Sequence, residues 1–231
     1  MASQGATGRH GQPLSGSEAA EQQKAAAARA AAELVADGMR VGLGTGSTVA
    51  HFIPALADRG LQGLRCVATS PATERAARDL GLAVFDLDEV GALDIAVDGA
   101  DQISGAGWLV KGGGGAHTRE KIVAAAAGEF VVIASADKAV AELSPPIPLE
   151  LLRFGAERTL AALDPSRLRD APPSPDDGLI ADYLGPVGDP AALAARLSAT
   201  PGVVDHGLFA PELVSIVLIA REDGVERRDV A

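Results

Sequence analysis

The pattern of hydrophobic positions changes from helical to strand-like near Arg40. Before it, residues 18–37 are rich in alanine, and Ser17 and Gly38 are suited to begin and end a helix there. After it, short runs of β-branched residues and leucine alternate with segments of helical period. The predicted strands read RVGLG, LRCVAT, AVFDL, LDIAVDG, WLVKG and FVVIAS, and the predicted helices cover residues 47–59, 73–80 and 118–128. This alternation predicts a parallel sheet covered by helices on both faces.

The alternation ends at SPPIPLE, where three prolines interrupt it. A helix over residues 155–163, the loop DAPPSPDDG, the strand LIADY and a helix over residues 190–198 then predict a small α+β unit. The last hydrophobic runs, VVDHGLF and VSIVLIA, predict two strands, and we expect the second to return to the main sheet. Residues 1–16 are small and polar, and we expect them to form a disordered leader.

Composition narrows the class of protein. Hydrophobic residues make up 47% of the chain and aromatic residues 3%, so the core must consist of Ala, Val, Leu and Ile. The net charge of −11 argues against nucleic acid or a membrane as a partner, because both carry negative charge. No apolar run approaches the roughly 20 residues that span a bilayer, and no signal-peptide pattern is present. We therefore expect a cytoplasmic protein.

Cysteine and histidine give no sign of a metal site. Cys66 is the single cysteine, which excludes an internal disulfide and predicts a small buried hydrophobic residue. The four histidines are scattered along the chain, and a lone histidine is more often structural than a ligand. We predict no metal and no cofactor.

The first of three loops with candidate chemistry runs from Gly44 to Thr48, between a predicted strand and a helix. Its glycines allow the backbone to approach a ligand, while the helix start and three hydroxyl side chains offer donors to an anion. A tight turn with a hydroxyl helix cap is the alternative. A dinucleotide site is disfavoured, because the next strand ends in Thr69 and Ser70 rather than in an acidic residue.

The second and third loops add carboxylates and a lysine. Asp98 and Asp101 follow the strand LDIAV, where two acids can bind sugar hydroxyls and move protons between oxygens, although a simple turn would contain the same residues. Lys111 precedes four consecutive glycines, and Glu120 follows them. Because such a run is costly in backbone entropy, it favours main chain wrapped around a ligand, with Lys111 and Glu120 facing one cavity. A flexible hairpin before a helix with surface charges is the alternative.

The three loops also carry a family resemblance. In their order and spacing, GLGTGSTV, DIAVDGAD and LVKGGGGAHTREK resemble the signature segments of the type A ribose-5-phosphate isomerases. Further segments that are similar to this family read ASADK, PIPLELLRFG and TPGVVDHGLFA. The resemblance covers the chain from Ser17 to its end.

Together, the hydrophobic pattern and the resemblance imply an α/β fold with two parts. We expect a Rossmann-like, parallel-sheet core of residues 17–144 and 208–231. A smaller α+β domain of ferredoxin-like type, residues 145–207, would be inserted near the C-terminus. The family further suggests a homodimer or homotetramer.

The resemblance assigns the site residues position by position. Glu120 corresponds to the proton acceptor of the family, and Lys111, Asp98 and Asp101 complete the catalytic set. The residues implied to bind substrate are Thr45, Gly46, Ser47, Thr48, Asp98, Gly99, Ala100, Asp101, Lys111, Gly112, Gly113 and Gly114, with Lys138 and Lys24 at the phosphate.

The implied reaction is the metal-independent interconversion of D-ribose 5-phosphate and D-ribulose 5-phosphate in the non-oxidative pentose phosphate pathway. Asp98 or Asp101 would assist ring opening, and Glu120 would move a proton from carbon 2 to carbon 1 through a cis-enediolate. Lys111 would stabilise the negative oxygen of that intermediate. Burial would raise the pKa of Glu120, whereas Lys111 and Lys121 would lower it, and the sequence leaves this balance open.

Three positions depart from the family pattern. Gln102 stands where Glu is general, His117 where a small or apolar residue is usual, and Arg153 where Pro is common. We expect His117 to crowd the glycine loop. Two alternatives to the isomerase are another sugar-phosphate enzyme, such as an amino-sugar phosphate deaminase or a lactonase, and a non-catalytic sugar-phosphate sensor. The first would need its own acid and histidine arrangement and the second a DNA-binding module, and neither is found.

Overall fold

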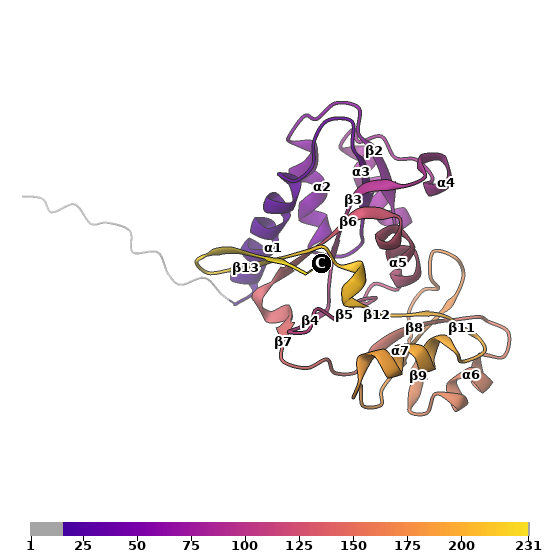
Figure 1. Ribbon diagram of the computed structural model, residues 1–231. Helices are drawn as coiled ribbons and strands as arrows, with labels where there is room; N and C mark the ends of the chain where they lie inside the picture. Colours follow the sequence, from indigo (N-terminus) through magenta and orange to yellow (C-terminus); the bar gives the residue numbers. More distant parts are fainter. Residues whose placement is uncertain (1–15, 231) are drawn as a thin grey trace, which may run out of the picture.

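A computed structural model describes residues 16–230 of the chain (Figure 1). The predicted leader lies outside this range except for Gly16, at which helix α1 (Gly16–Ala32) begins. Ser17 is therefore inside the helix and does not precede it. The helix ends five residues before Asp37, because the N–H groups of Leu34 and Val35 bond three residues back and tighten the chain into a turn.

The main sheet of the described residues has six strands. In spatial order they are β14 (Gly224–Asp229), β13 (Ile216–Arg221), β6 (Ala127–Ser135), β3 (Leu93–Gly99), β1 (Arg40–Leu43) and β2 (Arg65–Ala68). All neighbours pair in parallel except β13 and β14, which form an antiparallel hairpin. The predicted parallel sheet is confirmed, as is the return of VSIVLIA to it as β13. The hairpin strand β14 was not predicted, because its polar sequence GVERRD lacks the hydrophobic pattern of a buried strand.

Helices cover both faces of this sheet. Val131 and Ile133 of β6 pack in one cluster with α1 and α2, whereas Phe130 and Val132 pack in another with α5. Ala27, Ala28, Ala31 and Ala32 of α1 are buried, and their small side chains allow the helix to lie close to the sheet. Cys66 is buried in the same cluster, as predicted.

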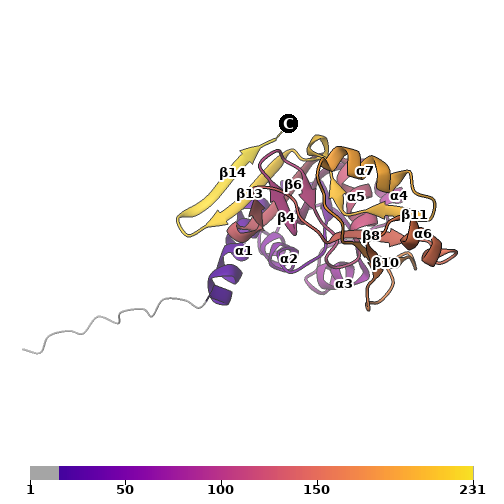
Figure 2. The same cartoon turned by 90° about the horizontal axis from the view of Figure 1, so that it is seen from below.

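The remaining strands of residues 16–230 form two further sheets. One consists of β11 (Val203–His206), β8 (Ile147–Leu151), β10 (Leu179–Tyr183) and β9 (Ser166–Leu168), paired antiparallel in this order. The other consists of β12 (Leu208–Phe209), β5 (Leu109–Val110), β4 (Gln102–Ser104) and β7 (Ala139–Val140). The four-stranded antiparallel sheet and the β13–β14 hairpin lie at opposite ends of the molecule (Figure 2).

Three predicted strands differ from the structure. VVDHGLF is divided into β11 and β12, which belong to different sheets. WLVKG shortens to β5, which pairs antiparallel with β4 and does not join the main sheet. The chain between the end of β3 and β5 is too short for a parallel crossover. AVFDL forms a single bridge between Val84 and Cys66, because the chain turns at Asp86 into a short helix.

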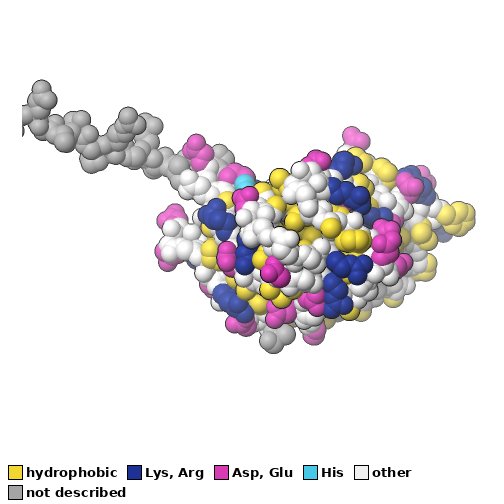
Figure 3. Space-filling model, turned by 90° about the horizontal axis from the view of Figure 1, so that it is seen from above, with side chains coloured by type: hydrophobic (Ala, Val, Ile, Leu, Met, Phe, Trp, Pro, Cys, Tyr) yellow, Lys and Arg dark blue, Asp and Glu magenta, His cyan; other side chains and the backbone are white. Residues whose placement is uncertain are grey.

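Apart from the end of α1, the predicted helices end within three residues of their expected positions, and the helix over residues 190–198 matches its expected range. After α1 the helices are α2 (Val49–Ala57), α3 (Pro71–Asp79), α4 (Leu87–Val90), α5 (His117–Ala125), α6 (Ala156–Ala162) and α7 (Pro190–Ser198), with 3-10 turns η1 (Ala136–Lys138) and η2 (Pro211–Leu213). None of the helices in the described range could cross a membrane. On the face shown in Figure 3, basic and acidic side chains are interspersed.

Candidate active site

The candidate site is a cavity of about 300 Å³ at the carboxyl ends of β1, β3 and β6, which are neighbours in the sheet. Loops after parallel strands meet at this edge, so segments far apart in the sequence come together there. The residues that line it are Ala20, Lys24, Thr45, Gly46, Ser47, Thr48, Gly99, Ala100, Asp101, Lys111, Gly112, Gly113, Gly114, Glu120, Ser135, Asp137 and Lys138. Of the predicted site residues, Asp98 alone is missing from this wall.

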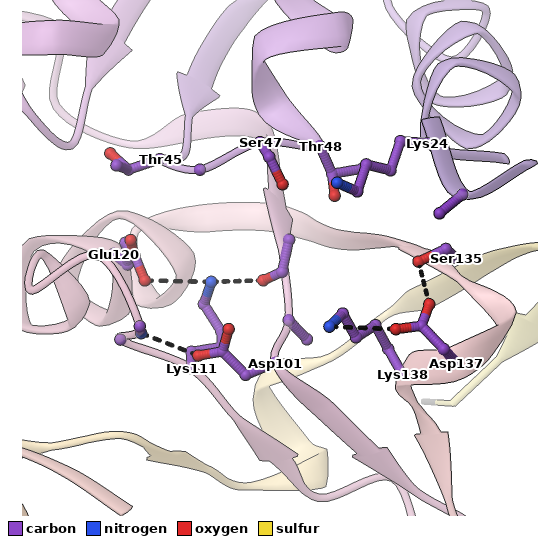
Figure 4. A pocket seen from close by; sticks show the side chains of 17 residues that line it. Lys24, Thr45, Ser47, Thr48, Asp101, Lys111, Glu120, Ser135, Asp137 and Lys138 are labelled. Atoms are coloured by element: carbon purple, nitrogen blue, oxygen red, sulfur yellow. Dashed lines mark hydrogen bonds and ion pairs between the residues drawn. The ribbon is translucent and has the colours of Figure 1, made fainter. Parts of the chain in front are cut away.

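One end of the cavity carries two lysines. Lys24 comes from α1 and lies beside Thr48, at the start of α2, whereas Lys138 comes from η1 and lies across the cavity, next to Asp137 (Figure 4). Each lysine pairs with an acidic neighbour in the free protein: Lys24 with Glu21 at 2.7 Å and Lys138 with Asp137 at 3.2 Å. Because the first N–H groups of a helix have no acceptor within it, this end presents two cations and a helix start to an anion.

Thr45 takes a different position from its neighbours in the first loop. Its hydroxyl bonds with those of Thr69 at 2.8 Å and Ser70 at 2.9 Å, and its N–H donates to Asp98. In Figure 4 it lies toward Glu120, at the far end of the wall from Lys138. The side chain of Thr45 therefore fixes the loop and lies away from the end of the cavity that carries the two lysines.

The opposite end of the cavity contains a buried lysine between two carboxylates. The Nζ of Lys111 lies 2.8 Å from Oδ2 of Asp98, and it donates to the carbonyl of Gly99 at 2.5 Å. It also lies 3.1 Å from Oε2 of Glu120 (Figure 4). The ammonium thus forms ion pairs with both carboxylates and a hydrogen bond with one backbone carbonyl. The ammonium also lies over the ring of Phe209, 5.4 Å from its centroid.

Burial sets the ionisation of this cluster. It raises the pKa of Glu120 to about 8, the charge of Asp98 adds to this effect, and Lys111 opposes it. Burial also raises the pKa of Asp98, against the effect of Lys111. Burial disfavours the charged form of Lys111, but the carboxylates of Asp98 and Glu120 outweigh it and raise the pKa of this lysine. The sequence left open whether burial or the neighbouring lysines would set the pKa of Glu120, and burial has the larger effect.

Lys121 does not take part in that balance, contrary to the expectation from sequence. Its ammonium lies 2.6 Å from Oδ1 of Asp205 and donates to the carbonyl of His206. Consecutive residues of a helix point about 100° apart, so Lys121 and Glu120 face different surroundings.

The two aspartates of the second loop are in different environments. Asp98 is buried, and its Oδ1 accepts the N–H groups of Thr45 at 3.1 Å and Gly99 at 2.7 Å while Oδ2 pairs with Lys111. Asp101 is exposed, lines the cavity and accepts the N–H of Gly113 at 2.9 Å. Asp101 can therefore reach a ligand, whereas Asp98 holds the lysine and the first loop.

The glycine loop is closely packed against His117. The backbone of Gly112 has φ +100°, and a Cβ there would lie 2.7 Å from Nδ1 of His117. The buried imidazole of His117 thus crowds the loop, as predicted. Burial also lowers the pKa of His117 to about 4. Gln102, another of the three departures from the family pattern, does not line the cavity. Its side-chain amide donates to the carbonyl of Ser144 and accepts the N–H of the same residue.

Sequence reasoning missed three residues of the wall: Ala20, Ser135 and Asp137. Ser135 ends β6, so the rule that ligands bind at strand ends could have found it and the following Asp137. Ala20 lies on α1 and carries no chemical signal.

Comparisons with known proteins agree with this geometry. The profile of the family described as Ribose 5-phosphate isomerase A (phosphoriboisomerase A) matches residues 65–224. A ribose-5-phosphate isomerase A of Caulobacter vibrioides is 48% identical over 223 residues, which cover 90% of this chain and 98% of the relative.

Solved structures show the same fold. The crystal structure of ribose 5 phosphate isomerase A from Neisseria gonorrhoeae has a TM-score of 0.87 and 31% identity, covering 91% of this chain and 97% of that chain. A D-ribose-5-phosphate isomerase in complex with phospho-erythronic acid has a TM-score of 0.86 and 32% identity, covering 91% of this chain and 99% of that chain.

Proposed function

The chain belongs to the ribose 5-phosphate isomerase A family, and we propose that it interconverts ribose 5-phosphate and ribulose 5-phosphate, a reaction of the pentose phosphate pathway, with Glu120 as the base. The observation that carries this proposal is the division of one cavity into two ends. Lys24 and Lys138 face one end, and Lys111 with Glu120 faces the other. A five-carbon sugar phosphate has the same division, with its phosphate on carbon 5 and its reacting atoms at carbons 1 and 2.

The phosphate is assigned to the end with the lysines. There, Lys24 and Lys138 neutralise its charge, and Ser47 and Thr48 donate hydrogen bonds from the start of α2. To bind the phosphate, Lys24 and Lys138 must give up their ion pairs with Glu21 and Asp137. The charge of the phosphate compensates for the loss of these pairs.

Ring opening is assigned to Asp101. Of the two candidate acids, Asp101 lines the cavity and Asp98 does not, so only Asp101 is placed to exchange a proton with the ring oxygen. The same carboxyl group can later move a proton from the oxygen on carbon 2 to the oxygen on carbon 1.

Glu120 then carries the carbon-bound proton. In its ionised form it takes the proton from carbon 2 of the open aldose, and the electron pair moves into the carbonyl on carbon 1 to give a cis-enediolate. Once protonated, Glu120 no longer attracts Lys111 as a carboxylate does, and this pair is the longest of the three contacts of the ammonium. Lys111 is thus released to the negative oxygen when that charge appears. Return of the proton to carbon 1 gives the ketose.

The test is an isomerase assay on the purified chain, with ribose 5-phosphate as substrate and a chelator present. We expect turnover under these conditions, and its absence would overturn the proposal. The Glu120→Gln variant, purified in parallel, controls for isomerase from the expression host. Phospho-erythronic acid, which one structural relative binds, is expected to compete with substrate, because its carboxylate resembles the charge of the enediolate.

Some finer expectations remain predictions. These are a cytoplasmic location, a homodimer or homotetramer, the absence of a metal or cofactor, and the description of residues 145–207 as an inserted ferredoxin-like domain beside a Rossmann-like core. Light scattering on the eluted protein measures the assembly, and the chelator in the assay tests the metal.

A further inference from the structure

Arg169 contacts the glycine loop from the four-stranded antiparallel sheet. Its Nη1 donates to the carbonyls of Gly112 at 3.0 Å and Gly113 at 3.1 Å. The arginine follows β9 and is distant in sequence from the loop. It is not among the residues that line the cavity.

The arginine is itself held in place. Its Nε donates to Oδ2 of Asp182 at 2.9 Å and its Nη2 to Oδ1 at 2.6 Å, which is a two-point ion pair with a carboxylate on β10. Its backbone N–H donates to the carbonyl of Ile180 on the same strand. With Nε and Nη2 engaged, Nη1 remains for the loop, and the planar guanidinium fixes its direction.

These contacts decide where the loop directs its N–H groups. In a trans peptide the C=O and the N–H point in opposite directions. Because Arg169 holds the carbonyl of Gly112, the N–H of Gly113 points away from it, toward Asp101, to which it donates at 2.9 Å. Because Arg169 also holds the carbonyl of Gly113, the N–H of Gly114 points away too, and Gly114 lies on the cavity wall facing Thr45.

We infer that Arg169 is a positioning residue for isomerisation, which orients the peptides of Gly112 to Gly114 against Asp101 and the substrate without touching either. The inference rests on the proposed function for its effect on turnover. Glycine backbones sample many conformations, so a loop of four glycines needs an external anchor to keep one of them. Arg169 supplies that anchor from a part of the chain that contributes no residue to the cavity wall.

The test compares Arg169→Ala and Arg169→Lys with the wild type. Lysine has a single ammonium and cannot bind the Asp182 carboxylate at two points and both carbonyls together. We expect kcat to fall by about 10- to 100-fold in both variants, since a small misplacement of reacting groups has effects of this size. KM should change by less than about 3-fold, because the phosphate end is untouched.

Arg119→Ala is the matched control. Arg119 also makes a two-point ion pair, with Asp176 at 2.7 Å on both oxygens, and it lies next to Glu120 in sequence, but it does not contact the glycine loop. We expect it to keep wild-type kcat.

Two measurements separate positioning from a merely structural role. Guanidinium ions added at millimolar concentration, against the same concentration of potassium chloride, should partly restore kcat in Arg169→Ala and leave Arg119→Ala unchanged. Hydrogen exchange followed by mass spectrometry should show faster exchange at residues 112–115 in both Arg169 variants, at temperatures where they are folded.

Wild-type kcat in Arg169→Lys would overturn the inference, as would a loss of kcat with neither faster exchange nor rescue by guanidinium. If Arg169→Ala does not fold, the Lys variant carries the same test. Should the wild type lack isomerase activity, the proposed function fails, whereas the exchange experiment still decides whether Arg169 orders the loop.

Discussion

The α-carbon of Gly44 lies against the carboxyl group of Asp98, so closely that a Cβ at position 44 would lie 2.0 Å from Cγ of the aspartate. The N–H of Gly44 donates to the carbonyl of Val97, and the next N–H, of Thr45, donates to Asp98 itself. The backbone of the first loop thus packs directly against the end of β3. Asp98 is kept where it meets Lys111 because no side chain stands at position 44.

Gly44→Ala should therefore damage the cluster as well as the fold. The added methyl must displace Asp98 from Lys111, and overpacking of this kind typically lowers the free energy of unfolding by about 1–3 kcal/mol. We expect a lower midpoint in urea and a lower kcat in the variant. Gly105→Ala is the control, because a Cβ there meets no atom within 4 Å and should leave both quantities unchanged. Wild-type kcat in Gly44→Ala would show that the Asp98–Lys111 pair is not needed.

Glu120→Gln should separate binding from proton transfer. The amide keeps the shape of the side chain but cannot accept a proton, so kcat should fall by roughly 10²- to 10⁴-fold, as is usual for a positioned base. Binding of ribose 5-phosphate, measured by calorimetry, should be nearly unchanged. Exchange of the carbon-bound proton with deuterated water should disappear, since that exchange requires the enediolate. Retention of wild-type exchange would remove Glu120 from the role of base and leave it as an acidic residue near a helix start.

The pH dependence of the reaction should follow the Glu120 cluster. Burial raises the pKa of Glu120 to about 8, so below that pH a growing fraction is protonated and cannot act as a base. We expect kcat/KM to rise with pH by about tenfold per unit and to level off near pH 8, with an apparent pKa that belongs to Asp98, Lys111 and Glu120 together. The two histidines near the glycine loop do not account for this rise, because burial lowers the pKa of His117 to about 4 and that of His206 to about 3. A flat profile between pH 6 and 9 at constant ionic strength would contradict the assignment.

Much of the fold could be predicted from the sequence because its signals are local. LDIAVDG has a hydrophobic centre, residues 95–97, that is buried, and it forms a central strand of the sheet. WLVKG also begins with a short hydrophobic run but lies in another sheet, because the short connection before it allows only an antiparallel turn. Connection length, as well as hydrophobicity, thus decides which sheet a strand joins.

The cavity could be predicted for a related reason. The first loop and Asp101 follow β1 and β3 of the main sheet, and one rule brings such residues to one edge of a parallel sheet. Lys111 follows β5 of another sheet, so this rule does not place it. The contacts of single side chains could not be predicted in this way. Three such contacts depend on residues distant in the sequence: the ion pair of Asp98 with Lys111, the hydrogen bond of Thr45 with Thr69, and the contact of Arg169 with the glycine loop.

Arg59 should stabilise the fold by closing the end of α1. Its guanidinium donates to the carbonyl of Ala32, which also accepts the N–H of Val35, and to the carbonyl of Val35, three residues beyond the end of that helix. Arg59→Ala should lower the free energy of unfolding by about 1–2 kcal/mol, the usual size for hydrogen bonds from a charged group that is partly exposed. Arg227→Ala, which removes an exposed pair with Asp229, should change it by less than about 0.5 kcal/mol. Equal urea midpoints for the two variants would contradict this role of Arg59.

The contrast between Asp101 and Asp98 tests the division of labour in the second loop. Ribulose 5-phosphate cannot close a five-membered ring, because its carbon 5 oxygen carries the phosphate, so exchange of its carbon 1 proton needs no ring opening. Asp101→Asn should therefore slow the conversion of ribose 5-phosphate by more than tenfold, since loss of an acid–base group usually costs a factor of roughly 10² or more. The exchange of the carbon 1 proton of ribulose 5-phosphate should be far less affected.

Asp98→Asn should act through charge instead. The charge of Asp98 raises the pKa of Glu120, so its removal should shift the acid limb of the kcat/KM profile to lower pH. Deuterium incorporation followed by NMR and the two pH profiles measure both effects. If Asp98→Asn blocked only the conversion of the cyclic sugar, and Asp101→Asn only shifted the pH profile, the roles of the two carboxylates would have to be exchanged.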